Sequence, residues 1–138
     1  DIGIILEDQY FHEGFIRVIE SLEEGKTLAA VERQCLGFSH IDLGKRIAEK
    51  WQFPDLVKDA IVYHHTMMSY SGESQDVLRC LEVANVLCTV KGYSSVGINL
   101  VKLSRTTLPG LGLDRDDLRV LSEELDEELK RNAAMMRV

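Results

Sequence analysis

Proline is rare in this chain of 138 residues, where it occurs only as Pro54 and Pro109. Because proline interrupts regular secondary structure, its rarity favours long uninterrupted helices over many short strands. No segment shows the alternation of apolar and polar residues that is typical of a strand. Apolar residues make up 45% of the chain and charged residues 28%, as in ordinary globular proteins. The sequence therefore predicts an all-α fold of about six helices joined by short connections.

Long apolar runs are missing as well. None approaches the ~18–20 residues that a membrane-spanning helix requires, and nothing resembles a signal peptide. The three cysteines, Cys35, Cys80 and Cys88, include no C-x-x-C pair. We therefore expect reduced, buried thiols in a cytoplasmic protein that has no membrane partner, with neither a zinc-binding nor a disulfide framework.

Basic residues are outnumbered, with 16 Lys and Arg against 23 Asp and Glu, which gives a formal net charge of −7. Nucleic-acid binding depends on Lys and Arg that displace counterions from phosphates, so this balance argues against a nucleic-acid partner. Motifs of serine hydrolases, Walker-type nucleotide sites and dinucleotide sites are absent. The cysteines lie in apolar helix patterns, which favours a role in packing over nucleophilic catalysis.

Apolar spacing and capping residues divide the chain into helices. Ser39 and Asp42 have the spacing of a capping box, and Thr27 and Gly37 suit the two ends of a shorter helix. The predicted helices span approximately residues 8–22, 27–36, 39–51, 54–65, 76–91 and 114 onward, after a segment at 3–6 that could end an earlier helix. The expected connections are a loop at residues 66–74, a loop at 93–99 followed by a short element at 100–103, and a turn at 109–112.

Three histidines stand at the ends of two successive apolar helix faces. His40 begins the buried face of its helix, and His64 and His65 end the next helix. Gly44 follows His40 by one turn, and a mid-helix glycine costs roughly 1 kcal/mol, so it indicates either a close helix approach or space for a ligand. Neutral imidazoles are common ligands of zinc and iron, and three on converging faces predict a polar pocket. A single histidine at a helix end is more often a capping or core residue, so a pocket without a metal remains an alternative.

A site for a hard metal ion normally adds carboxylates to its imidazoles. Asp1 and Glu82 are the candidates on faces that could meet the histidines, although Glu82 could equally face solvent. Three other acidic residues and one further histidine are expected to be exposed to solvent: Asp42, Asp55, Asp59 and His12.

Several spaced motifs follow one another in the first two thirds of the chain. They are Asp1-Ile2-Gly3, Glu32-x-x-x-x-Gly37-x-x-His40, His40-x-x-x-Gly44, Ala48-x-Lys50-Trp51-x-x-Pro54 and Ala60-Ile61-x-x-His64-His65. This order resembles the HDOD domain, the HD-related output domain of bacterial signalling proteins, and the first motif looks like the end of the His-Asp-Ile-Gly signature of the wider HD superfamily. The resemblance implies an HD-like helical bundle in a single domain fragment, residues 1–138, whose upstream helices are missing. Residues 1–91 would be the HD-like core and residues 92–138 a variable C-terminal helical extension.

The resemblance also implies where a metal centre would lie. Catalytic HD enzymes use an upstream His, a His-Asp pair and a later Asp, and the HD-GYP phosphodiesterases, which cleave cyclic di-GMP, add further histidines. In this chain Asp1 keeps the Asp of the pair, whose His is expected just before the chain start, and the later Asp falls on Cys88, with Asn85 at a neighbouring acidic position. The Gly-Tyr-Pro motif is absent. The added histidines correspond to His40, His64 and His65. Loss of a carboxylate ligand implies a degenerate metal site.

These departures favour a non-catalytic signal-transduction domain that contacts a signalling protein, a fused signalling domain or a second copy of itself. No catalytic residue and no cofactor are then expected. The alternative is a metal-dependent phosphohydrolase or cyclic-dinucleotide phosphodiesterase that uses iron, manganese or zinc. In the first case Asp1, His40, His64 and His65 form a vestigial pocket shaped by Gly44, Asn85 and Cys88; in the second the same four residues are metal ligands. A nucleic-acid-binding module is the least favoured reading.

Overall fold

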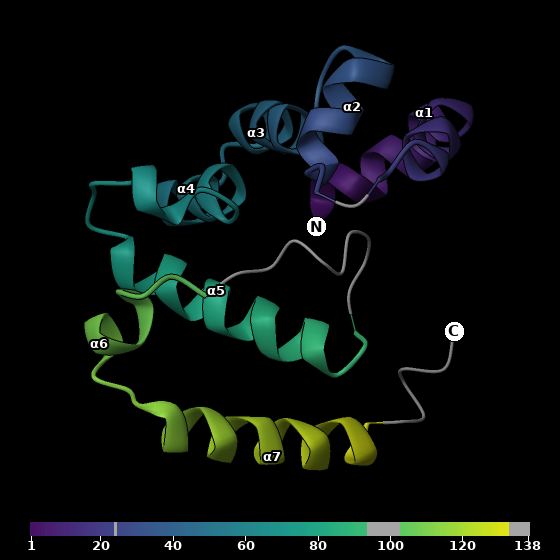
Figure 1. The fold of residues 1–138 in the computed structure, drawn as a ribbon. Helices are drawn as coiled ribbons and strands as arrows, with labels where there is room; N and C mark the ends of the chain where they lie inside the picture. The colour runs from purple at the N-terminus through teal and green to yellow at the C-terminus, as the bar shows by residue number, and fades with distance from the viewer. Residues whose placement is uncertain (24, 94–102, 133–138) are drawn as a thin grey trace. The chain divides into compact units, whose positions relative to one another are not determined.

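The computed structural model describes residues 1–23, 25–93 and 103–132. Every regular element in this part of the chain is a helix, which confirms the predicted all-α class (Figure 1). The chain divides into two compact units, residues 1–103 and 104–138, which are described separately here. The predicted boundary between residues 91 and 92 stays a prediction. Most of the segment predicted as a loop and a short element at 93–103 lies outside the described residues.

Helix α1 (Ile2–Glu20) begins directly after Asp1, whose side chain accepts a hydrogen bond of 2.9 Å from the backbone N–H of Gly3. We predicted a helix only from residue 8 onward, and that boundary is wrong. The helix continues through Phe11, where φ −131° and ψ 32° mark a kink. The ring of Phe11 packs edge-on against Phe38 with 5.1 Å between centroids, so a tertiary contact accompanies the kink.

Helix α2 (Leu28–Leu36) begins and ends at the predicted capping residues, and α3 (His40–Lys50) begins at its predicted capping box. Thr27 Oγ1 accepts a hydrogen bond from Ala30 N, and Gly37 ends α2 with φ 83°, a left-handed conformation that suits glycine. Ser39 and Asp42 form both halves of the capping box at the start of α3. This box fixes the first turn of α3, and His40 is the first residue of that turn.

Helix α4 (Asp55–Tyr63) follows Pro54, which is its N-cap residue, whereas we predicted Pro54 inside the first turn. It ends at Tyr63, so that His64 is the C-cap residue and His65 lies beyond it. A short 3₁₀-helix, η1 (Met67–Ser69), lies inside the segment predicted as a loop. Helix α5 (Gln75–Val90) completes the first unit and buries Leu78 and Val83.

The second unit contains α6 (Thr107–Leu111) and α7 (Arg115–Arg131). The turn predicted at residues 109–112 is wrong, because most of it is α6, which Gly112 ends with φ 67°. Pro109 lies within the first turn of α6, where its missing N–H costs no helical hydrogen bond. Asp114 caps α7 through its side chain, and Asp117 completes a capping box. No residue of α7 is buried.

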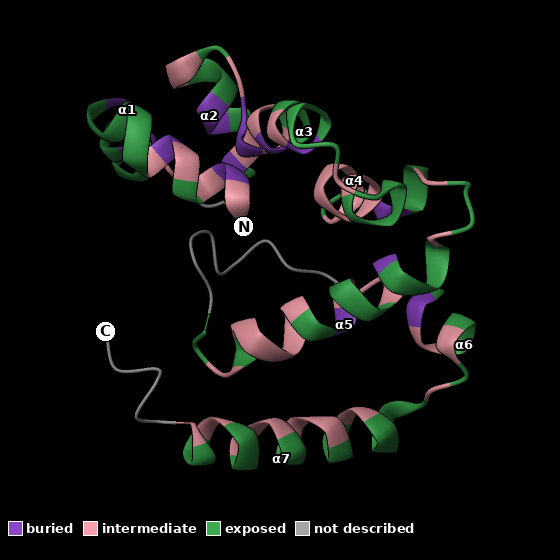
Figure 2. Ribbon diagram, turned by 180° about the vertical axis from the view of Figure 1, so that it is seen from behind, coloured by how far each residue is buried: buried purple, intermediate pink, exposed green. Residues whose placement is uncertain are grey.

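The buried apolar core joins α1 to α2. Val18, Leu28 and Val31 form it, and further buried residues lie along one face of α3 (Figure 2). The expectation of buried thiols is wrong for Cys80, which is exposed on α5, whereas the other two cysteines are partly buried. No helix in the described part of the chain combines the length and the apolar content that crossing a membrane would require.

Candidate functional site

Four side chains from three segments meet at one place. Asp1 caps α1, His40 begins α3, and the remaining two follow the end of α4. One potential ligand atom from each residue lies within 4.8 Å of the others. The cluster consists of Asp1, His40, His64 and His65, and we call it the histidine cluster. These are the four residues that the sequence predicted as pocket candidates.

A buried carboxylate orients His40. Glu32 on α2 lies 2.6 Å (Oε2) and 2.8 Å (Oε1) from His40 Nδ1, and its Oε2 also accepts a 2.9 Å hydrogen bond from the backbone N–H of His40. Both side chains are fully buried. A carboxylate accepts hydrogen bonds, so Nδ1 is the donor in this contact and Nε2 is the ring nitrogen left for another partner. We assigned no role to Glu32 from the sequence, although its spacing before His40 was part of the recognised motif.

A backbone carbonyl orients His64 in a similar way. Its Nδ1 donates a hydrogen bond of 2.8 Å to the carbonyl oxygen of Ile61, which leaves Nε2 facing Asp1 Oδ2 at 3.0 Å. Burial lowers the pKa of His64, so the neutral ring is favoured. A lone pair on Nε2 would then face a carboxylate oxygen with no hydrogen between them.

The two Nε2 atoms are the unsatisfied groups of the cluster. Nε2 of His40 lies 3.7 Å from the same Asp1 Oδ2 atom that His64 faces. Both Nε2 atoms are buried, and neither has a hydrogen-bond partner in the described structure. A buried polar atom without a partner costs about 1–3 kcal/mol, so two of them around one carboxylate oxygen indicate a site for a bound cation or proton.

His65 adds a third imidazole. Its ring centroid lies 3.9 Å from that of His64 and 5.2 Å from that of His40. The residue is exposed overall, yet its ring packs against both other imidazoles. Burial of the ring, followed by the charges of His64 and His40, lowers the pKa of His65 to about 4. The ring is therefore neutral at physiological pH and available as a ligand.

The donor set fits a borderline metal ion such as zinc or iron(II). Neutral imidazoles with one carboxylate suit these ions better than Mg²⁺ or Ca²⁺, which prefer oxygen ligands. Ligand atoms about 2.0–2.1 Å from a tetrahedral zinc ion stand about 3.3 Å apart. The separations of 3.0 Å and 3.7 Å from Asp1 Oδ2 to the two Nε2 atoms lie on either side of that value. His40, His64, His65 and Asp1 are the residues that would hold such an ion.

Two glycines allow the helices to approach the cluster closely. A Cβ at Gly3 would lie 2.0 Å from the backbone oxygen of His40, and a Cβ at Gly44 would lie 2.8 Å from Cγ2 of Ile61. Of the two reasons that we considered for Gly44, the structure therefore favours close helix packing. Asn85 and Cys88, the other predicted pocket-shaping residues, are partly buried on α5, and Cys88 supplies no ligand atom to the histidine cluster.

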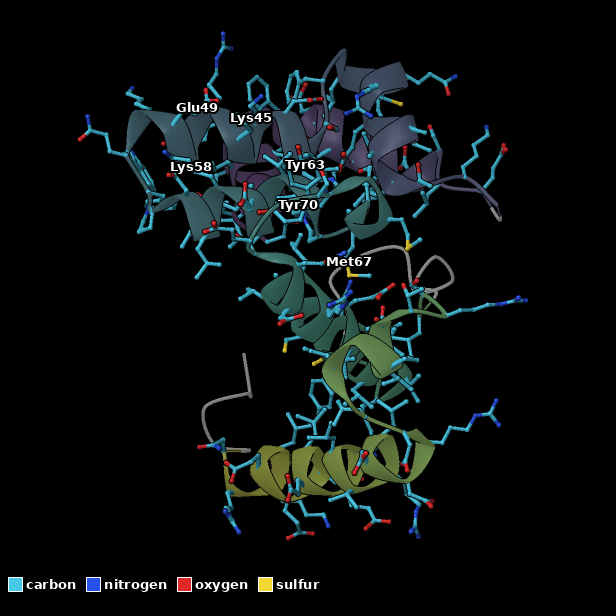
Figure 3. The ribbon with its side chains drawn as sticks, turned by 90° about the vertical axis from the view of Figure 1, so that its left-hand side faces the viewer. Lys45, Glu49, Lys58, Tyr63, Met67 and Tyr70 are labelled. Carbon is cyan, nitrogen blue, oxygen red and sulfur yellow. The ribbon has the colours of Figure 1, made fainter. Side chains whose placement is uncertain are left out.

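The remaining predicted carboxylates lie outside the cluster. Asp59 is not solvated as expected, because it accepts hydrogen bonds of 2.6 Å from Tyr70 Oη and 2.9 Å from Ser74 Oγ. Tyr70 also packs against Tyr63 on α4, and Figure 3 labels both rings. The other positions are an exposed Asp42 in the capping box, an exposed Asp55 beside Lys58, a partly buried Glu82 and an exposed His12 that contacts Asp8.

One family model matches part of the chain. The HDOD domain family matches residues 1–67, which confirms the resemblance for that segment. The matched segment contains the whole histidine cluster and Glu32 and ends before Asn85 and Cys88. No curated protein and no solved structure matches the chain.

Proposed function

We propose that the HDOD domain in residues 1–67 is a non-catalytic signal-transduction domain that holds one divalent cation in its histidine cluster and acts through contacts with other proteins. The observation that carries the proposal is the donor set itself: three imidazoles and a single carboxylate surround two unsatisfied Nε2 atoms. This set can satisfy one cation of the zinc or iron type.

The shortage of carboxylates argues against hydrolysis. Two-metal phosphodiester chemistry needs anionic ligands that hold both ions and offset their charge. The positions where the resemblance expects further acidic residues carry Asn85 and Cys88, and Cys88 is not part of the cluster. Asp1 is therefore the single anionic ligand among the described residues of the cluster. We infer that the site holds one cation and lacks the anionic ligands that a second cation, needed for phosphodiester hydrolysis, would require.

Exposed apolar side chains at the junction of α3 and α4 support a role in protein contacts. Trp51 is 55% exposed and Leu56 is 47% exposed, and Trp51 stacks edge-on against Phe53. Exposed aromatic anchors are typical of protein interfaces. A signalling protein or a fused signalling domain is the partner that this proposal expects.

The test uses the full-length protein, purified without an affinity-tag metal. We expect about one equivalent of bound zinc, iron or manganese by elemental analysis, and no turnover of a cyclic dinucleotide or a simple phosphodiester with added Mn²⁺, Fe²⁺ or Mg²⁺. His64→Asn should lose the cation, whereas His12→Asn, which changes an exposed histidine outside the cluster, should keep it. Robust turnover by the wild type would overturn the non-catalytic assignment.

A metal-dependent phosphohydrolase is the second candidate. It is favoured by the buried Glu32, because a carboxylate that orients a ligand histidine is also common in catalytic metal sites. A bound metal would supply charge stabilisation for the phosphate. The metal would be held by the four residues of the histidine cluster, His40, His64, His65 and Asp1. Cation-dependent turnover that is lost in His64→Asn and retained in His12→Asn would establish this alternative.

A further inference from the structure

A second buried carboxyl group lies behind Glu32. Glu7, on α1, is fully buried, and neither of its side-chain oxygens accepts a hydrogen bond from a donor in the described structure. Glu32 is its neighbour from α2, close enough for a side-chain hydrogen bond between the two carboxyl groups. Two ionised carboxylates cannot hydrogen-bond to each other, because both are acceptors only. A single proton on one of the two groups makes it a donor and allows the hydrogen bond.

The surroundings decide which of the two groups carries that proton. Glu32 accepts from the backbone N–H and from Nδ1 of His40, so its oxygens already act as hydrogen-bond acceptors. No such donor reaches Glu7 in the described structure. The charged groups that face Glu7 from α2 and α3 are Glu32 and Asp42, and both disfavour a second negative charge. Burial, together with these two carboxylates, raises the pKa of Glu7 to about 8.

We propose that Glu7 is a protonated carboxylic acid that donates a hydrogen bond to Glu32, and that it is a positioning residue for His40. The resulting chain runs from Glu7 O–H to the Glu32 carboxylate and from there to His40 Nδ1–H, so that His40 Nε2 is aimed into the histidine cluster. The positioning role rests on the proposed cation site, whereas the shared proton does not depend on it.

Helix α1 is connected to the histidine cluster in two places, through Asp1 and through Glu7. Asp1 belongs to the cluster, and Gly3 lies against the backbone of His40. Glu7 lies one turn after Gly3 on the same face of α1 and reaches Glu32. A carboxylate that already accepts from a neutral acid keeps its single charge in a low-dielectric site without a counter-cation. A change in the position of α1 would therefore move both a ligand and the group that orients another ligand.

The proton itself can be observed by infrared difference spectroscopy on the full-length protein without added metal. A protonated carboxylic acid has a C=O stretch above the amide band, and we expect this band in the wild type at neutral pH and its absence in Glu7→Gln. Glu13→Gln, which changes an exposed glutamate of the same helix, should keep the band. Absence of the band from the wild type, or its persistence in Glu7→Gln, overturns the assignment of the proton to Glu7.

The positioning role is tested by zinc titration of three proteins. Glu7→Gln keeps a neutral donor of nearly the same shape and should bind zinc as the wild type does. Glu7→Leu fills the space without a donor and should bind zinc about tenfold more weakly, as is usual for the loss of a group behind a metal ligand. Equal affinity of Glu7→Leu and the wild type overturns the positioning role. A wild type that binds no zinc defeats the cation site and the positioning role together, while the infrared result stands separately.

Discussion

Glu32 and His40 form a fully buried carboxylate–imidazole pair in which the carboxylate accepts from both the backbone N–H and the ring Nδ1 of the histidine. The two hydrogen bonds fix the ring orientation as well as its tautomer, because Nδ1 must be the protonated nitrogen. Nε2 therefore points into the histidine cluster, where it has no hydrogen-bond partner among the described residues. A pair of this kind holds the histidine in the orientation of a metal ligand before any ion binds.

Substitution of Glu32 by Gln should damage both stability and cation binding. The amide offers one acceptor oxygen in place of two, and its NH2 group would face donors of His40. We expect the free energy of unfolding to fall by about 1–3 kcal/mol in urea denaturation. Zinc affinity should fall about 10- to 100-fold in titration calorimetry. Glu49→Gln, on the exposed surface of α3, is the matched control and should change neither quantity.

Both ends of α2 and the start of α3 were predictable from sequence because their causes are local. Thr27, Gly37 and Ser39 act on backbone groups within a few residues, so their identity and spacing are enough to position α2 and α3. The approach of His40 to His64 could be anticipated for a related reason. Both stand at helix ends on apolar faces, and faces of that kind pack against each other in a helical domain.

The burial of Glu7 and the hydrogen bonds of Asp59 could not be anticipated in this way. Each looks like an ordinary polar position in an amphipathic helix, and each is buried or hydrogen-bonded only because of a residue on another element. The kink at Phe11 depends likewise on a tertiary neighbour, Phe38. Cys80 is exposed, and its apolar helix pattern could not predict this, because the pattern does not indicate which face of α5 remains uncovered.

Gly3→Ala should be more harmful than Gly44→Ala. A Cβ at Gly3 would lie 2.0 Å from a backbone oxygen of α3, which cannot move without shifting the helix, whereas at Gly44 the obstacle at 2.8 Å is the methyl group Cγ2 of Ile61. We expect Gly3→Ala to lower the free energy of unfolding by about 3 kcal/mol and Gly44→Ala by about 1 kcal/mol, measured by urea denaturation. The reverse order would contradict the close approach of α1 to His40.

Tyr70→Phe should loosen the connection between α4 and α5. The hydroxyl of Tyr70 donates to Asp59 and accepts a 3.1 Å hydrogen bond from the backbone N–H of Ser74 at the start of α5. Its removal leaves these two groups short of a partner, at an expected cost of about 1–3 kcal/mol. Thermal unfolding of the full-length protein measures the loss. Tyr10→Phe, at a residue that is 76% exposed, should leave the midpoint unchanged, and an equal loss in both variants would refute the proposed role of the hydroxyl.

The metal-free protein should lose stability as the pH falls from about 6.5 towards 4. The pKa of His65 is lowered from 6.5 to about 4, chiefly by burial, and burial also lowers the pKa of His64. In this range the unfolded chain therefore binds more protons than the folded protein does, so acid favours unfolding. Urea denaturation at a series of pH values, with a chelator present, gives the slope of the free energy of unfolding against pH. His65→Gln should flatten it, whereas His12→Gln, at an exposed position, should reproduce the wild-type slope. A wild-type slope in His65→Gln would show that the third imidazole is not held neutral by the cluster.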